Sequence, residues 1–441
     1  MDKKQIIDGL KISINQLIPC TVVTAFTSLL DDFNLSQLDR SLIKNDTGVI
    51  CIDANSILIW FVHMLEEKIF FKLTRDKIKF SPEEQRMIKT IPSLLQNLKN
   101  IHSKEFLGFS LKFSSRISFG DLIVAKFLEK EPAHALWNTI SIIASLQELT
   151  FKRYEEQKCT SGFIYTDHPD EFIRQICQTN YRFYEFEEKT KLDYSFFDTP
   201  ASFRYVDGRN SYYLIDDDRQ VQGVIRLARP SIFSLIDRIG NLHLNDILYH
   251  MPGNNWIAFV GLKDEVFVIP GKYEQLKWSK NHWFLRDRSI IFNLLEAFDF
   301  KSQLIEIFVS IIFSLSELRF GSIILIPDDE NELAPTIGKI DRTSFGNMLR
   351  QSIQSAGIED LMSTDSLLGI LASDGLTTIS KKGMVISCGD IIDISKAAPK
   401  NIQGGGRSQA AIASSYYGLS IKISQDGPVS FFKKGELLIQ V

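Results

Sequence analysis

The chain has 441 residues; Lys and Arg together number 50 and Asp and Glu 54, which gives a formal net charge of -4. Hydrophobic residues make up 44% and charged residues 24%, a composition that excludes collagen-like and disordered classes. At about 150 residues per domain, the length predicts two or three domains. Proteins that bind duplexes by neutralising phosphates usually carry a basic excess, so we expect no bulk nucleic-acid partner.

Five scattered cysteines without a Cys-x-x-Cys pair are typical of reduced, buried thiols. The first ten residues lack the apolar segment of a signal peptide. The longest apolar runs, Ser56–Met64 and Ile307–Ser316, are far shorter than the roughly 20 residues that cross a bilayer. We therefore expect a soluble, cytoplasmic protein without a membrane partner.

Residues 1–155 are predicted to form a mainly helical region with one strand. Ser81-Pro82-Glu83-Glu84 has the order of an N-cap, a proline at the first helical position and two acids that favour the positive helix end. Gly48–Asp53 is short, apolar and rich in β-branched residues, which predicts a buried strand.

Residues 156–295 mix helical and strand patterns. Thr166–Glu171 opens a helix with similar start signals. Two hairpins are predicted, one from Tyr212–Ile215 and Val221–Leu227, the other from Trp256–Leu262 and Val266–Ile269. This pattern favours a small α+β module of sensor or regulatory type, and nothing in these residues identifies its ligand.

The last region, residues 296–441, begins with the pattern of an amphipathic helix. Apolar residues at a 4-3-4-3 spacing share one helical face: Leu304, Phe308, Ile311, Leu315 and Leu318. A buried strand is predicted at Arg319–Ile326, closed by Pro327, and another helix at Ser344–Ile353.

Short strands separated by turns are predicted after this helix, at Leu368–Ala372, Thr377–Ile379, Met384–Ser387, Leu419–Ser424, Val429–Phe432 and Leu437–Gln440. Helices mixed with so many strands indicate an α/β domain, built on a mixed β-sheet flanked by helices. With the helical and α+β regions before it, the chain as a whole is predicted to be α+β.

Asp374-Gly375-Leu376 interrupts a strand-like run with an acid and a glycine. An aspartate at a strand end suits a divalent cation or a ribose hydroxyl, and glycine lets the backbone approach a ligand closely. Asp-Gly is also the commonest turn dipeptide, and a hairpin turn explains this motif better when it is taken alone.

Gly404–Ser415 joins three glycines to an arginine and an alanine-rich helix start. Backbone N–H groups at such a start, together with the charged fork of Arg407, favour a bound phosphate. The alternative is a flexible loop that leads into a tightly packed helix, where Ala410 and Ala411 allow close approach. The motif alone leaves both interpretations open.

Ser424-Gln425-Asp426-Gly427, taken alone, is typical of a turn. The order of the motifs is more specific: Arg319-x-Gly-x-Ile-Ile-Leu-Ile, then Asp-Gly-Leu, then Gly-Gly-Gly-Arg-Ser-Gln-Ala-Ala, then Ser-Gln-Asp-Gly-x-Val-Ser. Over about the last third of the chain, this order resembles the diadenylate cyclase domain of the DNA-integrity-scanning proteins and the membrane-anchored cyclases that make cyclic di-AMP.

The resemblance implies a domain that binds one ATP per subunit. Two subunits would face each other and condense two ATP into a cyclic dinucleotide second messenger, with release of pyrophosphate. The residues implied to bind the nucleotide are Gly375, Leu376, Gly405, Gly406, Ser408, Gln409 and Ser424. Asp374 and Arg407 would be catalytic, and a site for Mg²⁺ or Mn²⁺ would rest on Asp374 and Asp426.

The chain departs from the family pattern at two motifs. Gly406-Arg407-Ser408-Gln409 stands where the family has Thr-Arg-His-Arg, so a histidine and an arginine are absent, and all seven histidines precede residue 283. Ser424-Gln425-Asp426 stands in place of Ser-Glu-Glu. The pattern suits either a divergent cyclase or a nucleotide-binding sensor that has lost turnover.

Overall fold

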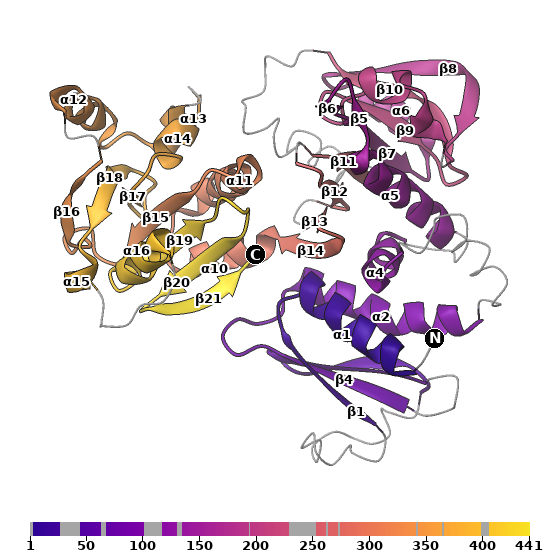
Figure 1. Cartoon of the computed structure of the whole chain (residues 1–441), viewed down its shortest axis with the longest axis horizontal. Helices are drawn as coiled ribbons and strands as arrows, with labels where there is room; N and C mark the ends of the chain where they lie inside the picture. Colours follow the sequence, from indigo (N-terminus) through magenta and orange to yellow (C-terminus); the bar gives the residue numbers. More distant parts are fainter. Residues whose placement is uncertain are drawn as a thin grey trace. The chain divides into compact units, whose positions relative to one another are not determined.

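The computed structural model describes residues 3–26, 45–62, 68–100, 117–129, 135–193, 195–228, 253–261, 263–271, 274–340, 343–363, 366–397 and 405–441 (Figure 1). These residues fall into two compact units, one made of residues 3–228 and 253–287 and the other of residues 288–441. Within these ranges, every helix is too short or too polar to cross a lipid bilayer.

The first unit begins with an antiparallel sheet in the order β1-β4-β3-β2, beside helix α1. Its elements are α1 (Lys3–Leu17), β1 (Thr21–Phe26), β2 (Gly48–Asp53), β3 (Ser56–Val62) and β4 (Lys68–Thr74). The strand predicted at Gly48–Asp53 is confirmed, but the prediction of a single strand in this region is wrong. Short apolar runs such as β3 have no helical or strand period of their own, and pairing with distant residues decides their structure.

A larger sheet in the order β14-β13-β12-β11-β7-β9-β10-β8 completes this unit (Figure 1). Its strands are β7 (Gly162–Thr166), β8 (Tyr181–Lys191), β9 (Ser211–Ile215), β10 (Gln220–Leu227), β11 (Asn255–Val260), β12 (Val266–Ile269), β13 (Glu274–Ser279) and β14 (His282–Asp287). Antiparallel β9–β10 and β11–β12 pairs confirm both predicted hairpins, although Leu262 lies outside the described residues.

Helices and short elements surround the two sheets: α2 (Pro82–Asn100), α4 (Phe119–Leu128), α5 (Ala135–Phe151), β5 (Arg153–Tyr154), β6 (Gln157–Lys158), α6 (Pro169–Ile176), the 3-10 helix η3 (Phe196–Asp198) and α7 (Ala201–Arg204). Helix α6 begins after His168 with proline in its first turn, as predicted. One cluster of buried side chains runs from Phe71 of β4 through Ile123 of α4 to Trp256 of β11. Both predicted N-terminal regions contribute to this core, and the boundaries at 155 and 295 stay predictions.

The second unit is built on a mixed sheet in the order β16-β18-β17-β15-β19-β20-β21. Its strands are β15 (Ser322–Pro327), β16 (Thr336–Lys339), β17 (Leu376–Ile379), β18 (Val385–Ile392), β19 (Gly418–Ile423), β20 (Val429–Lys433) and β21 (Glu436–Gln440). Strands β15 and β17 run parallel, and the other paired strands run antiparallel. The predicted mixed sheet and its α/β class are therefore confirmed.

Helices flank this sheet: α10 (Arg288–Ala297), α11 (Ser302–Leu318), α12 (Ser344–Ile353), α13 (Ile358–Ser363), α14 (Ser366–Leu371), α15 (Ile394–Ala397) and α16 (Gly406–Ser414). Ala411 and Ala413 of α16 pack against Ile323 and Leu376 on one face of the sheet. The apolar face of α11 is buried as the 4-3-4-3 spacing predicts, and α11 contacts β19.

Two predictions in this unit need correction. Leu368–Ala372 was expected to be a strand, but Ser366–Leu371 forms helix α14, with buried Leu367, Leu368 and Leu371 at helical spacing. An apolar run this short does not show whether its hydrophobic residues follow a helical or a strand period. The helical spacing of the three buried leucines becomes evident only in the folded structure. The strand expected from Arg319 begins at Ser322, because Arg319 adopts a left-handed conformation that ends α11.

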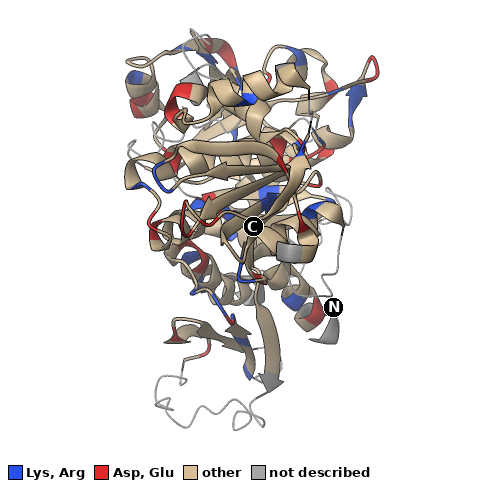
Figure 2. Cartoon of the chain, turned by 90° about the vertical axis from the view of Figure 1, so that its left-hand side faces the viewer, with Lys and Arg blue, Asp and Glu red and all other residues tan. Residues whose placement is uncertain are grey.

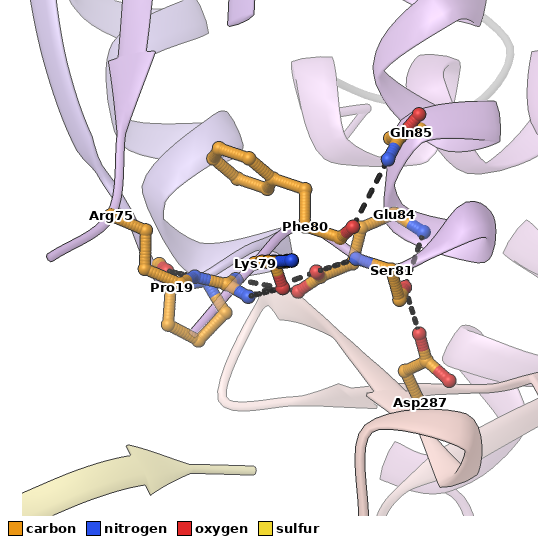
Figure 3. Close-up of polar contacts among 8 residues, drawn as sticks. All are labelled: Pro19, Arg75, Lys79, Phe80, Ser81, Glu84, Gln85 and Asp287. Atoms are coloured by element: carbon orange, nitrogen blue, oxygen red, sulfur yellow. Dashed lines mark hydrogen bonds and ion pairs between the residues drawn. The ribbon is translucent and has the colours of Figure 1, made fainter. Parts of the chain in front are cut away.

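A buried polar network fixes the start of α2 (Figure 3). The backbone N–H of Glu84 donates to Ser81 Oγ at 3.0 Å, and the backbone N–H of Ser81 donates to Glu84 Oε2 at 2.9 Å, which is a capping box. Arg75 donates to both carboxylate oxygens of Glu84, and the Ser81 hydroxyl donates to Asp287. The helix start predicted from Ser81-Pro82-Glu83-Glu84 is confirmed.

We predict that Glu84→Gln destabilises the first unit strongly. The side chains of Arg75 and Glu84 are only 8% and 3% exposed, so the variant leaves a buried guanidinium without its counter-charge. Breaking such a pair costs about 3–5 kcal/mol in the free energy of unfolding. Urea denaturation followed by tryptophan fluorescence measures the change. Glu83→Gln, which alters the neighbouring acid outside this pair, serves as the control, and equal stability of the two variants would contradict the prediction.

Candidate functional site

The motifs singled out in the second unit meet at one edge of its sheet. Strands β15 and β17 are parallel and both begin there, while β18 and β19 run antiparallel to them and end there. Asp374 and Gly375 directly precede β17, Gly321 directly precedes β15, and Ser424 directly follows β19. Figure 2 shows charged residues of both signs mixed at strand ends and turns of this unit, with mostly uncharged strands between them.

Arg407 and Asp374, predicted as the catalytic pair, form an ion pair. The Arg407 Nη2 group, in the first turn of α16, donates to Asp374 Oδ1 at 2.9 Å. The side chains are 36% and 69% exposed, so a ligand in solvent can reach both. The two residues are 33 positions apart in the sequence. The sequence predicted a role for each of them in metal or phosphate binding, but it did not predict that they form a pair.

Gly321 provides the surface on which the Arg407 guanidinium lies. A Cβ atom at position 321 would stand 2.4 Å from Arg407 Nη1 and 2.5 Å from its Cζ. Only a glycine leaves room for this contact, so Gly321 positions the arginine beside Asp374. The sequence motif contained this glycine, but gave it no role.

Gly375 is required by the backbone of the neighbouring strand. Its φ is +95°, and a Cβ there would lie 2.8 Å from the carbonyl carbon of Gly389 on β18. The close approach predicted for a ligand is thus made by the chain itself, in the connection from α14 to β17 and not in a hairpin turn. Leu376 is only 2% exposed and packs in the core beneath α16.

Gly405 and Gly406 differ from Gly375, because neither has a positive φ or a close contact with another described residue that demands glycine. Gly405 is the N-cap of α16 with φ -71°. Among the described residues, apart from chain neighbours and the backbone of α16, no heavy atom lies within 4 Å of a Cβ built on Gly405 or Gly406. No described residue therefore fills the space that a side chain at either position would take, as a phosphate cradle requires. Gln409 lies half-buried in the same turn, and Gly404 lies outside the described residues.

Lys422 is a residue of this site that the sequence interpretation missed. Its ammonium group donates to Ser408 Oγ at 2.8 Å, which brings β19 and the first turn of α16 together. Paired residues form one row across the sheet, from Asp390 through Leu376 and Ile323 to Lys422. The available signal was a lysine among the mainly apolar residues of a predicted buried strand.

Ser424 and Asp426 form the predicted turn between β19 and β20. The backbone N–H of Asp426 donates to Ser424 Oγ at 3.5 Å, and Gly427 completes the turn with φ +104°. Asp426 is exposed, and its use as a metal ligand stays a prediction. The described residues contain no cluster of three or more His, Cys, Asp or Glu side chains suited to a metal ion.

The carboxylates of the site still fit a hydrated Mg²⁺ or Mn²⁺. Asp374 uses Oδ1 for Arg407, which leaves Oδ2 as a ligand, while Asp390 is 2.9 Å from the Lys339 ammonium. Mg²⁺ is usually held by one or two carboxylates together with substrate phosphates and retained waters. Asp374 therefore has one carboxylate oxygen that could bind such an ion.

Cys388 lies next to the site on β18, with its thiol buried. Burial raises the pKa of its thiol, an effect that Lys339 and Arg350 oppose through their positive charges. A thiol with a raised pKa stays protonated at neutral pH, and the thiolate is the reactive form.

No family model matches the chain, and no curated protein matches it. Among solved structures, a cysteine double mutant of DacA from Staphylococcus aureus is similar, with 14% sequence identity and a TM-score of 0.20. The match covers 33% of this chain and 84% of that one. A TM-score this low does not establish a shared fold.

We predict that Gly375→Ala destabilises the second unit. An alanine at φ +95° is strained by about 1–3 kcal/mol, and its Cβ would also press on backbone atoms of Gly389 that cannot move aside. Thermal unfolding measures the loss. Gly369→Ala, where a Cβ meets nothing within 4 Å, is the control and should unfold near the wild-type temperature. Wild-type stability of Gly375→Ala would refute this packing.

Proposed function

We propose that residues 296–441 form a diadenylate-cyclase-like nucleotidyltransferase domain. In this reaction two ATP condense to a cyclic dinucleotide in a face-to-face dimer. The 3′ oxygen of each ATP attacks the α-phosphorus of the other, the 3′ hydroxyl proton leaves, and each ATP releases pyrophosphate. The first 295 residues would then serve as a sensor or regulatory region.

The observation that carries this proposal is the ion pair between Arg407 and Asp374 at the open start of α16. The two residues come from separate motifs of the family pattern, and the fold joins them beside the first-turn N–H groups. An arginine fork and a helix start favour phosphate, while an aspartate suits a metal ion or a hydroxyl. Phosphoryl transfer requires mainly such positioning and charge neutralisation.

In the proposed site, Arg407 and the N–H groups that follow Gly405 hold the triphosphate. Asp374 Oδ2 orients the attacking 3′ hydroxyl or holds Mg²⁺ or Mn²⁺, which supplies positive charge for the phosphates when it is bound. The open space at Gly405 and Gly406 admits the phosphates. Ser424 contacts the nucleotide from the end of β19.

A nucleotide sensor without turnover is the second candidate. Ser408 and Gln409 stand where the family has a histidine and an arginine, which weakens the case for catalysis. The pairing of Asp374 with Arg407 also occupies one oxygen of the carboxylate that a metal would need. Both candidates bind a nucleotide in the same place, so turnover distinguishes them.

Incubation of the purified protein with each of the four nucleoside triphosphates and Mg²⁺ or Mn²⁺ tests the proposal. We expect a cyclic dinucleotide from ATP, detected by mass spectrometry. Asp374→Asn should abolish this product, because it removes the charge that binds a metal and polarises the hydroxyl. Asp328→Asn, at the other end of β15, is the matched control and should keep activity. A shift of the melting temperature by ATP without any product would favour the sensor.

We predict that Gly321→Ala impairs ATP binding without unfolding the domain. The new Cβ would displace the end of the flexible Arg407 side chain, which can move at little cost to stability. Loss of a charge-assisted contact weakens ATP binding about 10- to 100-fold. Isothermal titration should give similar affinities for Gly321→Ala and Arg407→Ala. Wild-type affinity in Gly321→Ala would show that the guanidinium does not act from this position.

A further inference from the structure

Lys422 places a second cation in the row of residues beneath α16. It pairs with Ile323 of β15 on one side and with Ser430 of β20 on the other, on the face of the sheet that α16 covers. Its ammonium reaches the first helical turn, where it donates to Ser408 Oγ at 2.8 Å. The lysine is half-buried, so its charge lies at the edge of the core.

The cations on the strands and helix of this sheet differ in how they are paired. Arg407 is neutralised by Asp374 at 2.9 Å, and Lys339 is neutralised by Asp390 at the same distance. Lys422, by contrast, has no carboxylate within ion-pairing distance among the residues that the structure describes. Among the described residues, this half-buried cation is therefore hydrogen-bonded to a neutral hydroxyl and lacks a counter-charge, which an anionic ligand would supply.

The chemistry of the ammonium group indicates what completes this arrangement. A lysine carries three N–H donors, of which Ser408 takes one. The Arg407–Asp374 pair has no net charge, so it alone is a weak match for a polyanion. A site that takes a triphosphate therefore needs positive charge beyond that pair.

We infer that Lys422 binds phosphate oxygens of a nucleoside triphosphate, as the second cation of the site beside Arg407. This inference rests on the proposed function. Lys422 supplies the net positive charge, and Ser408 holds its ammonium at the first turn of α16. Arg407 and Lys422 thus approach the phosphates from α16 and from β19, respectively.

Isothermal titration of the full chain with ATP and with AMP, in the presence of Mg²⁺, tests this role. We expect Lys422→Met to weaken ATP binding about tenfold or more, because it removes a charged donor, and to affect AMP much less. Lys422→Arg, which keeps the charge, should restore most of the ATP affinity. Lys433→Met is the matched control, since Lys433 lies in the neighbouring strand and is paired with Asp328.

The outcomes separate this inference from the proposed function. If the wild type binds neither nucleotide, the proposed function fails and the inference fails with it. If the wild type binds ATP and Lys422→Met binds it equally well, only the inference is overturned. Equal losses for ATP and AMP, with a lowered melting temperature and no rescue by Lys422→Arg, would assign Lys422 a structural role and also overturn it.

Discussion

The candidate site depends on the parallel pairing of β15 and β17. Parallel strands need a long crossover, and here the chain passes through α12, α13 and α14 before it returns beside β15. The register that sets Ile323 opposite Leu376 brings Gly321 and Asp374 to the same edge of the sheet. A slip of one residue would turn the buried side chain of Leu376 away from α16, so burial holds the register.

Small side chains on α16 determine where the charged groups of the site lie relative to these strands. Ala411 and Ala413 let the helix lie close to the sheet, which places its first turn, with Arg407, directly above the start of β15. The core and the polar site are therefore set by the same helix. Lys422 adds a charge from the strand below, so one end of α16 is the meeting point of two cations and an aspartate.

Much of the fold of the second unit could be predicted from the sequence, because the sequence patterns that indicate its elements are local. Each signal is a pattern of neighbouring residues that form the predicted structure themselves. Examples are the amphipathic period of α11, the turn at Ser424–Gly427 and the glycines before Arg407. Leu368–Ala372 could not be assigned, since an apolar run this short has no period until its neighbours bury one face. The strands beside Gly48–Asp53 likewise depend on pairing between distant residues.

The site was harder to predict than the fold around it. Asp374 and Arg407 were singled out by residue type, but their contact follows from sheet topology and not from any spacing along the chain. Lys422 was overlooked because a lysine in a strand has no chemical signature by itself. Its proposed role follows from its hydrogen bond to Ser408 and from the absence of a carboxylate partner among the described residues.

The glycines of the candidate site are subject to different structural constraints. Gly375 is fixed by backbone geometry, so any descendant that keeps the fold must retain it. A Cβ at Gly405 or Gly406 would meet nothing within 4 Å among the described residues, so their packing places no demand for glycine there. The proposed phosphate ligand would select against side chains there. In a diverging lineage, larger residues at 405 and 406 with glycine kept at 375 would therefore mark a domain that had abandoned its ligand but not its architecture.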